Sequence, residues 1–153
     1  MKRALIYLLP LIVLVACNKV KRTSEKFSDA KIWKISSLII DGKYPENNGL
    51  WDVDDEINIY DSVPKLIWTN DIENVDMHWQ FSKRGKLFHL SLIGENCDNC
   101  NNLESNSLAV KAYRVSGTYE VIIKKKEEMK FVSTSLAHNG ENSTVEITLV
   151  PFL

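Results

Sequence analysis

From Lys31 to the C-terminus the chain is a succession of short segments rich in β-branched and aromatic residues, each closed by a turn signal. Apolar and polar residues alternate in several segments, and no long stretch shows the 3.6-residue period of an amphipathic helix. This pattern is typical of an antiparallel meander of about eight or nine strands, which closes into an up-and-down barrel or folds into a β-sandwich. The β-rich segments that are candidates for these strands cover residues 32–40, 50–53, 56–60, 65–69, 77–81, 86–92, 108–115, 119–124, 129–136 and 144–150.

The clearest hairpin joins residues 77–81 to residues 86–92 across Ser82-Lys83-Arg84-Gly85. If Phe81 pairs with Lys86, Trp79 lies opposite Phe88 and the apolar sets of both strands share one face. A three-residue turn would instead pair Phe81 with Leu87 and turn one set over, so apolar matching favours the first register. The two apolar sets are Met77, Trp79 and Phe81, and Phe88, Leu90 and Leu92.

A basic head, Lys2-Arg3, and an apolar run over residues 4–16 precede this region. About 13 residues of helix rise roughly 20 Å, short of the ~30 Å hydrocarbon core, so a secretory signal peptide is favoured over a membrane span. The run ends in Leu14-Val15-Ala16-Cys17, which resembles the lipobox of bacterial lipoproteins. An ordinary cleaved signal peptide is the alternative.

The lipobox resemblance implies cleavage before Cys17, a diacylglycerol on its sulfur and an acylated amino terminus. More than one acyl chain gives stable anchoring in a lipid bilayer. Asn18 after the cysteine fits sorting to the outer membrane, where the protein would face the periplasm or the cell surface.

The chain divides into a signal peptide (1–16), a lipidated cysteine with a polar, flexible tether (17–30) and one β-barrel domain (31–153). The tether has room for one helical turn near Ser24–Ala30. Without the leader the chain has 17 basic and 20 acidic side chains. A net charge near −3 gives no basic footprint for nucleic acid, so none is expected as a partner.

After the lipobox and tether, the segment Trp33–Lys43 resembles the start of small lipocalin-like lipoproteins of Bacteroidetes-type bacteria. The resemblance implies an up-and-down barrel in which Trp33 plugs one end, with a cup able to hold one small apolar ligand. Lys31 stands where the better-known lipocalins have glycine, so the resemblance is to the broader barrel class. The candidate ligand-binding residues are Trp33, Trp79, Phe81, Phe88 and Leu90.

Cys97 and Cys100 are the two cysteines left once Cys17 carries lipid. In an oxidising compartment they are expected to form a disulfide that closes a tight, asparagine-rich loop. A redox-active CxxC would require a helix N-terminus in a βαβ context, which this sequence does not suggest. A metal site would need more ligands than two thiolates.

Two other groups of polar residues invite a metal interpretation. In the favoured hairpin register His78 and His89 would lie opposite one another, but two half-exposed strand histidines are the simpler interpretation. The acidic cluster Asp52-Asp54-Asp55-Glu56 lacks the spacing of a calcium loop and is interpreted as a solvated turn. No metal or cofactor is therefore expected.

No phosphate loop, nucleophile elbow or zinc-protease motif occurs, and an enzyme is not expected. The sequence predicts a membrane-anchored lipoprotein whose barrel binds a small apolar ligand or a partner protein. The alternative is a structural, assembly or inhibitor lipoprotein that acts through its outer surface.

Overall fold

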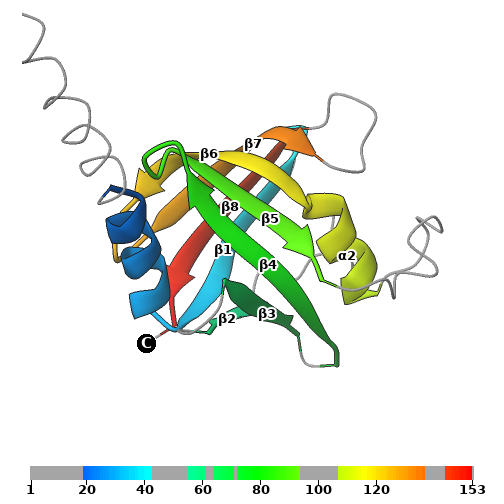
Figure 1. The fold of residues 1–153 in the computed structure, drawn as a ribbon. Coiled ribbons are helices and arrows are strands. Elements are labelled where there is room, and N and C mark those ends of the chain that lie inside the picture. Colours follow the sequence, from blue (N-terminus) through cyan, green and yellow to red (C-terminus); the bar gives the residue numbers. More distant parts are fainter. Residues whose placement is uncertain are drawn as a thin grey trace, which may run out of the picture.

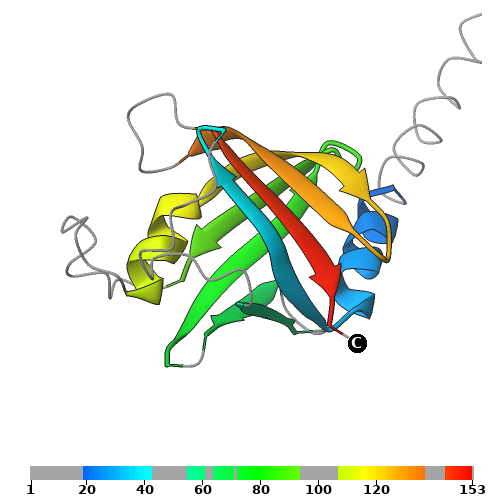
Figure 2. The same ribbon diagram turned by 180° about the vertical axis from the view of Figure 1, so that it is seen from behind.

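A computed structural model describes residues 19–42, 55–60, 64–70, 72–93, 107–136 and 144–152. The β-rich segment predicted at residues 50–53 lies outside these ranges. Within them, eight strands form one barrel and two short helices lie against it (Figures 1 and 2).

Each strand pairs antiparallel with the next, and β1 also pairs with β8, so that the sheet closes on itself. The up-and-down barrel predicted from the sequence is thereby confirmed and the sandwich is excluded. The strands are β1 (Ile32–Ile40), β2 (Glu56–Ile59), β3 (Lys65–Thr69), β4 (Asn74–Ser82), β5 (Leu87–Leu92), β6 (Gly117–Lys124), β7 (Met129–Leu136) and β8 (Val145–Pro151).

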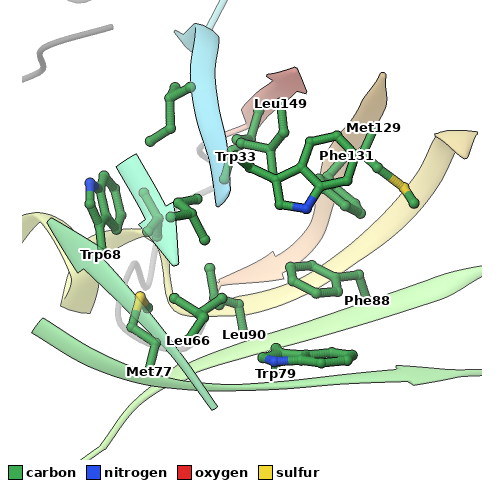
Figure 3. Packing of buried hydrophobic residues seen from close by; sticks show 14 of the residues in the cluster. Trp33, Leu66, Trp68, Met77, Trp79, Phe88, Leu90, Met129, Phe131 and Leu149 are labelled. Carbon is green, nitrogen blue, oxygen red and sulfur yellow. The ribbon is translucent and has the colours of Figure 1, made fainter. Parts of the chain in front are cut away.

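Alternation along the strands determines which side chains fill the barrel. Successive strand residues point to opposite faces, so every second residue enters the interior. In β3 these are Leu66 and Trp68, which are buried, while their neighbours are half-buried. Figure 3 shows the resulting core, in which side chains from all around the sheet meet in the centre.

The β4–β5 hairpin has the predicted face but not the predicted register. Trp79 lies opposite Leu90, not Phe88, and Phe81 lies opposite Phe88, not Lys86. The turn residues Lys83, Arg84 and Gly85 all have positive φ angles (45°, 62° and 71°), a conformation that lysine and arginine seldom adopt. Because the pairing shifted by two residues, the apolar face was preserved.

Residues 108–115, predicted as a strand, instead form helix α2 (Leu108–Val115). The hydroxyl of Ser107 caps its first turn by accepting a hydrogen bond from the Val110 amide (3.3 Å). Leu108, Ala112 and Val115 recur at helical spacing and are buried against β4 and β5. Burial of this face outweighs the strand propensity of the valines and the tyrosine.

Residues 19–29 form a second helix, here called the end helix, where a flexible tether was predicted. Thr23 and Phe27, four residues apart on one face, are buried against the barrel. The end helix lies across one end of the barrel and α2 lies at the other (Figure 1). Neither helix of the described part is long and apolar enough to cross a membrane.

Candidate functional site

Four of the five residues predicted to bind a ligand converge on one point of the barrel, and Phe27 of the end helix occupies it. Phe27 has no exposed surface. Its ring centroid lies 5.0–5.8 Å from the rings of Trp33, Trp79, Phe81 and Phe88. A side chain of the protein therefore stands where an apolar ligand was expected.

Trp33 joins the end helix to the barrel wall. Its ring stacks on Phe27 with an interplanar angle of 17°. Its indole Nε1–H donates a 2.7 Å hydrogen bond to the carbonyl of Phe27, which satisfies a group at the helix C-terminus. Trp33 thus lies at the closed end of the barrel and fixes the last turn of the end helix, next to Phe131, Met129 and Leu149 (Figure 3).

Little space is left inside the barrel. The interior cavity has a volume of about 20 Å³ and is lined by apolar residues such as Leu66, Met77 and Leu90. A cavity of this size holds at most one water molecule, and an apolar one stays dry. In this conformation the interior is a packed core and not a cup.

A larger hollow, here called the end groove, lies between the end helix and the barrel wall. Its volume is about 470 Å³. Apolar side chains line part of it, and polar side chains, all but one of them from the end helix, line the rest. The apolar residues are Val20, Tyr60, Pro64, Trp79 and Phe81, and the polar ones are Lys21, Ser24, Glu25, Ser28, Asp29 and Gln80.

Trp79 belongs to both the core and the lining of the end groove. Its side chain is almost fully buried, and its Nε1–H has no hydrogen-bond partner in the part of the chain that the structure describes. The other two described tryptophans are paired, Trp33 with Phe27 and Trp68 with the carboxylate of Asp55 at 2.8 Å. A buried unpaired donor costs about 1–3 kcal/mol, which an acceptor brought by a ligand would offset.

The polar edge of the end groove includes exposed ion pairs. Lys126 donates to the carboxylate of Asp29 at 2.8 Å, and this hydrogen bond, with the charge of Asp29, raises the pKa of Lys126. Lys21 lies 3.8 Å from Glu25 one turn away. The edge therefore offers charges of both signs, each already engaged with a neighbour.

The structure separates the two histidines that the predicted register had placed opposite one another. His78 pairs with Ser91 and His89 with Gln80. The ring nitrogens of His89 hydrogen-bond with the hydroxyls of Ser82 (2.7 Å) and Thr118 (3.1 Å). Within the described ranges no three acidic, histidine or cysteine side chains gather as a metal site would require.

The interpretation of the acidic cluster as a solvated turn is wrong for Asp55. It is 3% exposed and accepts the hydrogen bond from Trp68, so it ties the start of β2 to β3. Asp52 and Asp54 lie outside the described residues, as do Cys17, Cys97 and Cys100. The predicted lipidation and disulfide therefore stay predictions.

Sequence reasoning missed Phe27 as a functional residue. It is the single large apolar side chain among polar neighbours in residues 21–29, and that isolation was the available signal. No protein-family model, curated protein or solved structure matches this chain.

Proposed function

We propose that this chain is a lipid-anchored, extracytoplasmic lipoprotein whose barrel binds a small amphipathic ligand in the end groove, without catalysing a reaction. The observation that carries the proposal is the contrast in volume between a filled interior of about 20 Å³ and an end groove of about 470 Å³. Small-molecule sites are typically clefts of about 300–1,000 Å³ with mainly apolar walls and a few polar groups.

The lining of the end groove suits a molecule with an apolar body and a polar head. Trp79, Phe81 and Tyr60 offer aromatic surface for the body. Ser24 and Ser28 offer hydroxyl groups at the edge, and the unpaired Nε1–H of Trp79 offers a donor after a small adjustment of the wall. Fatty acids have this combination of properties.

The proposed anchor agrees with this choice of ligand. Cys17 precedes the end helix by two residues, which span at most about 7 Å when extended. Acyl chains on Cys17 would therefore hold the end groove close to the bilayer surface, where amphipathic molecules are concentrated.

The test is a titration of residues 17–153 carrying Cys17→Ser with sodium dodecanoate below its micelle concentration. Calorimetry and tryptophan emission are expected to report saturable binding of one ligand. Ser24→Phe fills the end groove and is expected to weaken binding about tenfold or more, the loss of roughly 1.4 kcal/mol. Arg22→Phe, on the same helix but outside the lining, is expected to leave binding unchanged. The site would be refuted if the protein without these substitutions showed no saturable binding, or if Ser24→Phe and Arg22→Phe bound dodecanoate equally well.

A second candidate is an apolar ligand that enters the interior and displaces Phe27. The observation that favours it is the wholly apolar lining of the interior cavity, which is formed by Phe27 together with residues of the barrel wall. Phe27→Ala distinguishes the two candidates because it enlarges the interior. Tighter dodecanoate binding by Phe27→Ala would favour the interior, whereas binding blocked by Ser24→Phe would favour the end groove.

A further inference from the structure

Basic side chains gather at the end of the barrel that the end helix covers. This end, here called the basic end, comprises residues 19–31, 83–86 and 124–128. These residues include eleven lysines and arginines and four acids, a formal charge of +7. The whole chain has a formal charge of −1, so the overall composition conceals a strong asymmetry.

Hydrogen bonds and close packing hold the three segments of the basic end together. The Nζ of Lys26 donates to the carbonyl of Lys124 (3.3 Å), and the Nζ of Lys124 donates to the carbonyl of Gly85 (3.4 Å). Gly85 packs so closely on Thr23 of the end helix that a Cβ atom there would lie 2.2 Å from the Thr23 hydroxyl oxygen. The charges therefore sit on one framework and not on independent loops.

Most of the positive charge of the basic end is exposed and lacks a compensating acid. Lys26 is half-buried, and the other ten basic side chains are exposed. Glu25 and Asp29 each pair with one lysine, in contacts where both partners keep about half or more of their surface exposed. The tip of the β4–β5 hairpin, residues 83–86, contributes three basic residues and no acid.

We infer that the basic end docks on the phosphate headgroups of anionic phospholipid and so fixes the orientation of the barrel on the bilayer. The attraction is additive, and each basic residue near an anionic surface strengthens binding roughly fivefold. The described residues outside the basic end carry seven acids and five basic groups, so the positive charge is confined to this end of the barrel.

The choice of a membrane partner rests on the proposed function in one respect, the anchor at Cys17. The basic end starts two residues after Cys17, so acyl chains in the bilayer would bring this end of the barrel, and no other, to the headgroups. Lipid chains and a basic patch are the two signals that together give stable membrane attachment. In this orientation α2 and the opposite end of the barrel face away from the membrane.

The experiment measures flotation of residues 17–153 carrying Cys17→Ser, a chain with no acyl group, with lipid vesicles. We expect binding to vesicles of phosphatidylcholine with 30% phosphatidylglycerol, none to pure phosphatidylcholine, and release as salt rises from 50 to 500 mM. The combined variant Lys83→Gln, Arg84→Gln and Lys125→Gln is expected to weaken binding more than tenfold.

A matched control changes the net charge equally at the other end. The control variant carries Ile72→Glu, Ser91→Glu and Ser135→Glu, all at exposed positions outside the basic end. It is expected to leave binding within about twofold, because salt screens exposed charges over about a Debye length, ~10 Å. Equal weakening by both triple variants, equal binding to both vesicle types, or retention on heparin without vesicle binding would overturn the inference. An unmodified Cys17 in the full chain would instead count against the anchor and leave the vesicle result standing.

Discussion

Phe27 shows how one side chain determines whether the barrel is a cup or a core. It reaches the interior from outside the sheet, because the end helix directs it between Trp33, Trp79 and Phe88. Aromatic rings at such distances attract one another beyond their burial, by about 0.5–1.5 kcal/mol per pair. Phe27 is therefore expected to stabilise both the barrel and the attachment of the end helix.

Phe27→Ala is expected to lower the free energy of unfolding by about 3–5 kcal/mol, because it removes buried surface and leaves an apolar cavity. That cavity is expected to admit benzene, so benzene should raise the melting temperature of the variant and leave that of the wild type unchanged. Urea unfolding and thermal scans with and without benzene provide the measurements.

Phe27→Leu is the matched control, because it keeps an apolar side chain in place. It is expected to cost less stability and to gain no benzene response. A loss of under 1 kcal/mol for Phe27→Ala would mean that the end helix does not contribute to the core as the structure indicates.

Tyr119 is a second residue whose burial has a measurable consequence. Its side chain is fully buried, its hydroxyl donates to the carbonyl of Val115, and burial raises the pKa of its phenol. The folded state therefore holds this proton more tightly than the unfolded state, in which the pKa is about 10. Its contribution to stability is present below pH 10 and is lost as the pH rises above 10.

Tyr119→Phe is expected to flatten the decline in unfolding free energy above pH 10 by up to about 1.4 kcal/mol per pH unit. At pH 8 the variant is expected to be about 1 kcal/mol less stable, because the hydrogen bond to Val115 is lost. Urea unfolding at pH 8, 9, 10 and 11 measures both effects. If the unfolding free energies of the variant and the wild type changed in parallel with pH, the raised pKa of Tyr119 would be contradicted.

At the scale of elements, the contact between the β4–β5 turn and the end helix depends on Gly85. Gly85 has a φ angle of +71° and touches Thr23, whereas Gly42 has a similar φ of +74° with no atom within 4 Å of an added Cβ. Alanine substitutions at the two glycines therefore distinguish the cost of backbone strain from the cost of close packing. Gly42→Ala is expected to cost about 1–2 kcal/mol from strain alone.

Gly85→Ala is expected to cost clearly more than Gly42→Ala, about 3 kcal/mol or more, because the added methyl group also pushes Thr23 away. Urea unfolding gives the two losses, and hydrogen exchange of the amides of residues 19–29 reports whether the end helix detaches. Equal losses for the two variants, with unchanged exchange in the end helix, would show that this contact contributes nothing.

Element by element, the sequence predicted the strands well and the helices poorly. The face of the β4–β5 hairpin followed from alternation, but the register depended on positive φ angles at Lys83 and Arg84, which no propensity suggests. For α2 a signal was present, since Ser107 is a good N-cap and Leu108, Ala112 and Val115 share a helical face. The valines and tyrosine of the segment masked it.

For the whole molecule, barrel closure could be predicted but the filling of the barrel could not. Strand number and alternation predicted a meander that closes into a barrel or folds into a sandwich, and alternation placed Trp79, Phe81, Phe88 and Leu90 on one face. The resemblance to lipocalin-like lipoproteins favoured the barrel and added Trp33. The structure has the closed barrel and buries all five residues in one core. Whether they surround a ligand or a side chain depends on the end helix. Its attachment rests on tertiary contacts of Thr23 and Phe27, and a polar segment with one phenylalanine has no periodicity that would reveal them.

The last prediction concerns how the whole molecule is held in place. Expressed in a bacterial host with its leader, the chain is expected to lose residues 1–16 and to carry acyl groups on Cys17, as mass spectrometry of the intact protein would show. Each methylene group of a buried acyl chain contributes about 0.8 kcal/mol to binding a membrane or a detergent micelle. Two or three acyl chains therefore outweigh any hydration that the protein loses, and they carry it into the detergent phase on Triton X-114 separation.

Cys17→Ser is expected to remove the acyl mass and move the protein to the aqueous phase, because the basic end alone has no affinity for a neutral detergent. Cys97→Ser removes a cysteine elsewhere and is expected to keep both the acyl mass and the detergent partitioning. An intact leader or an unmodified sulfur in the wild type would contradict the anchor. The barrel would then lose its fixed distance from the bilayer, and the end groove would have to obtain its ligand from solution.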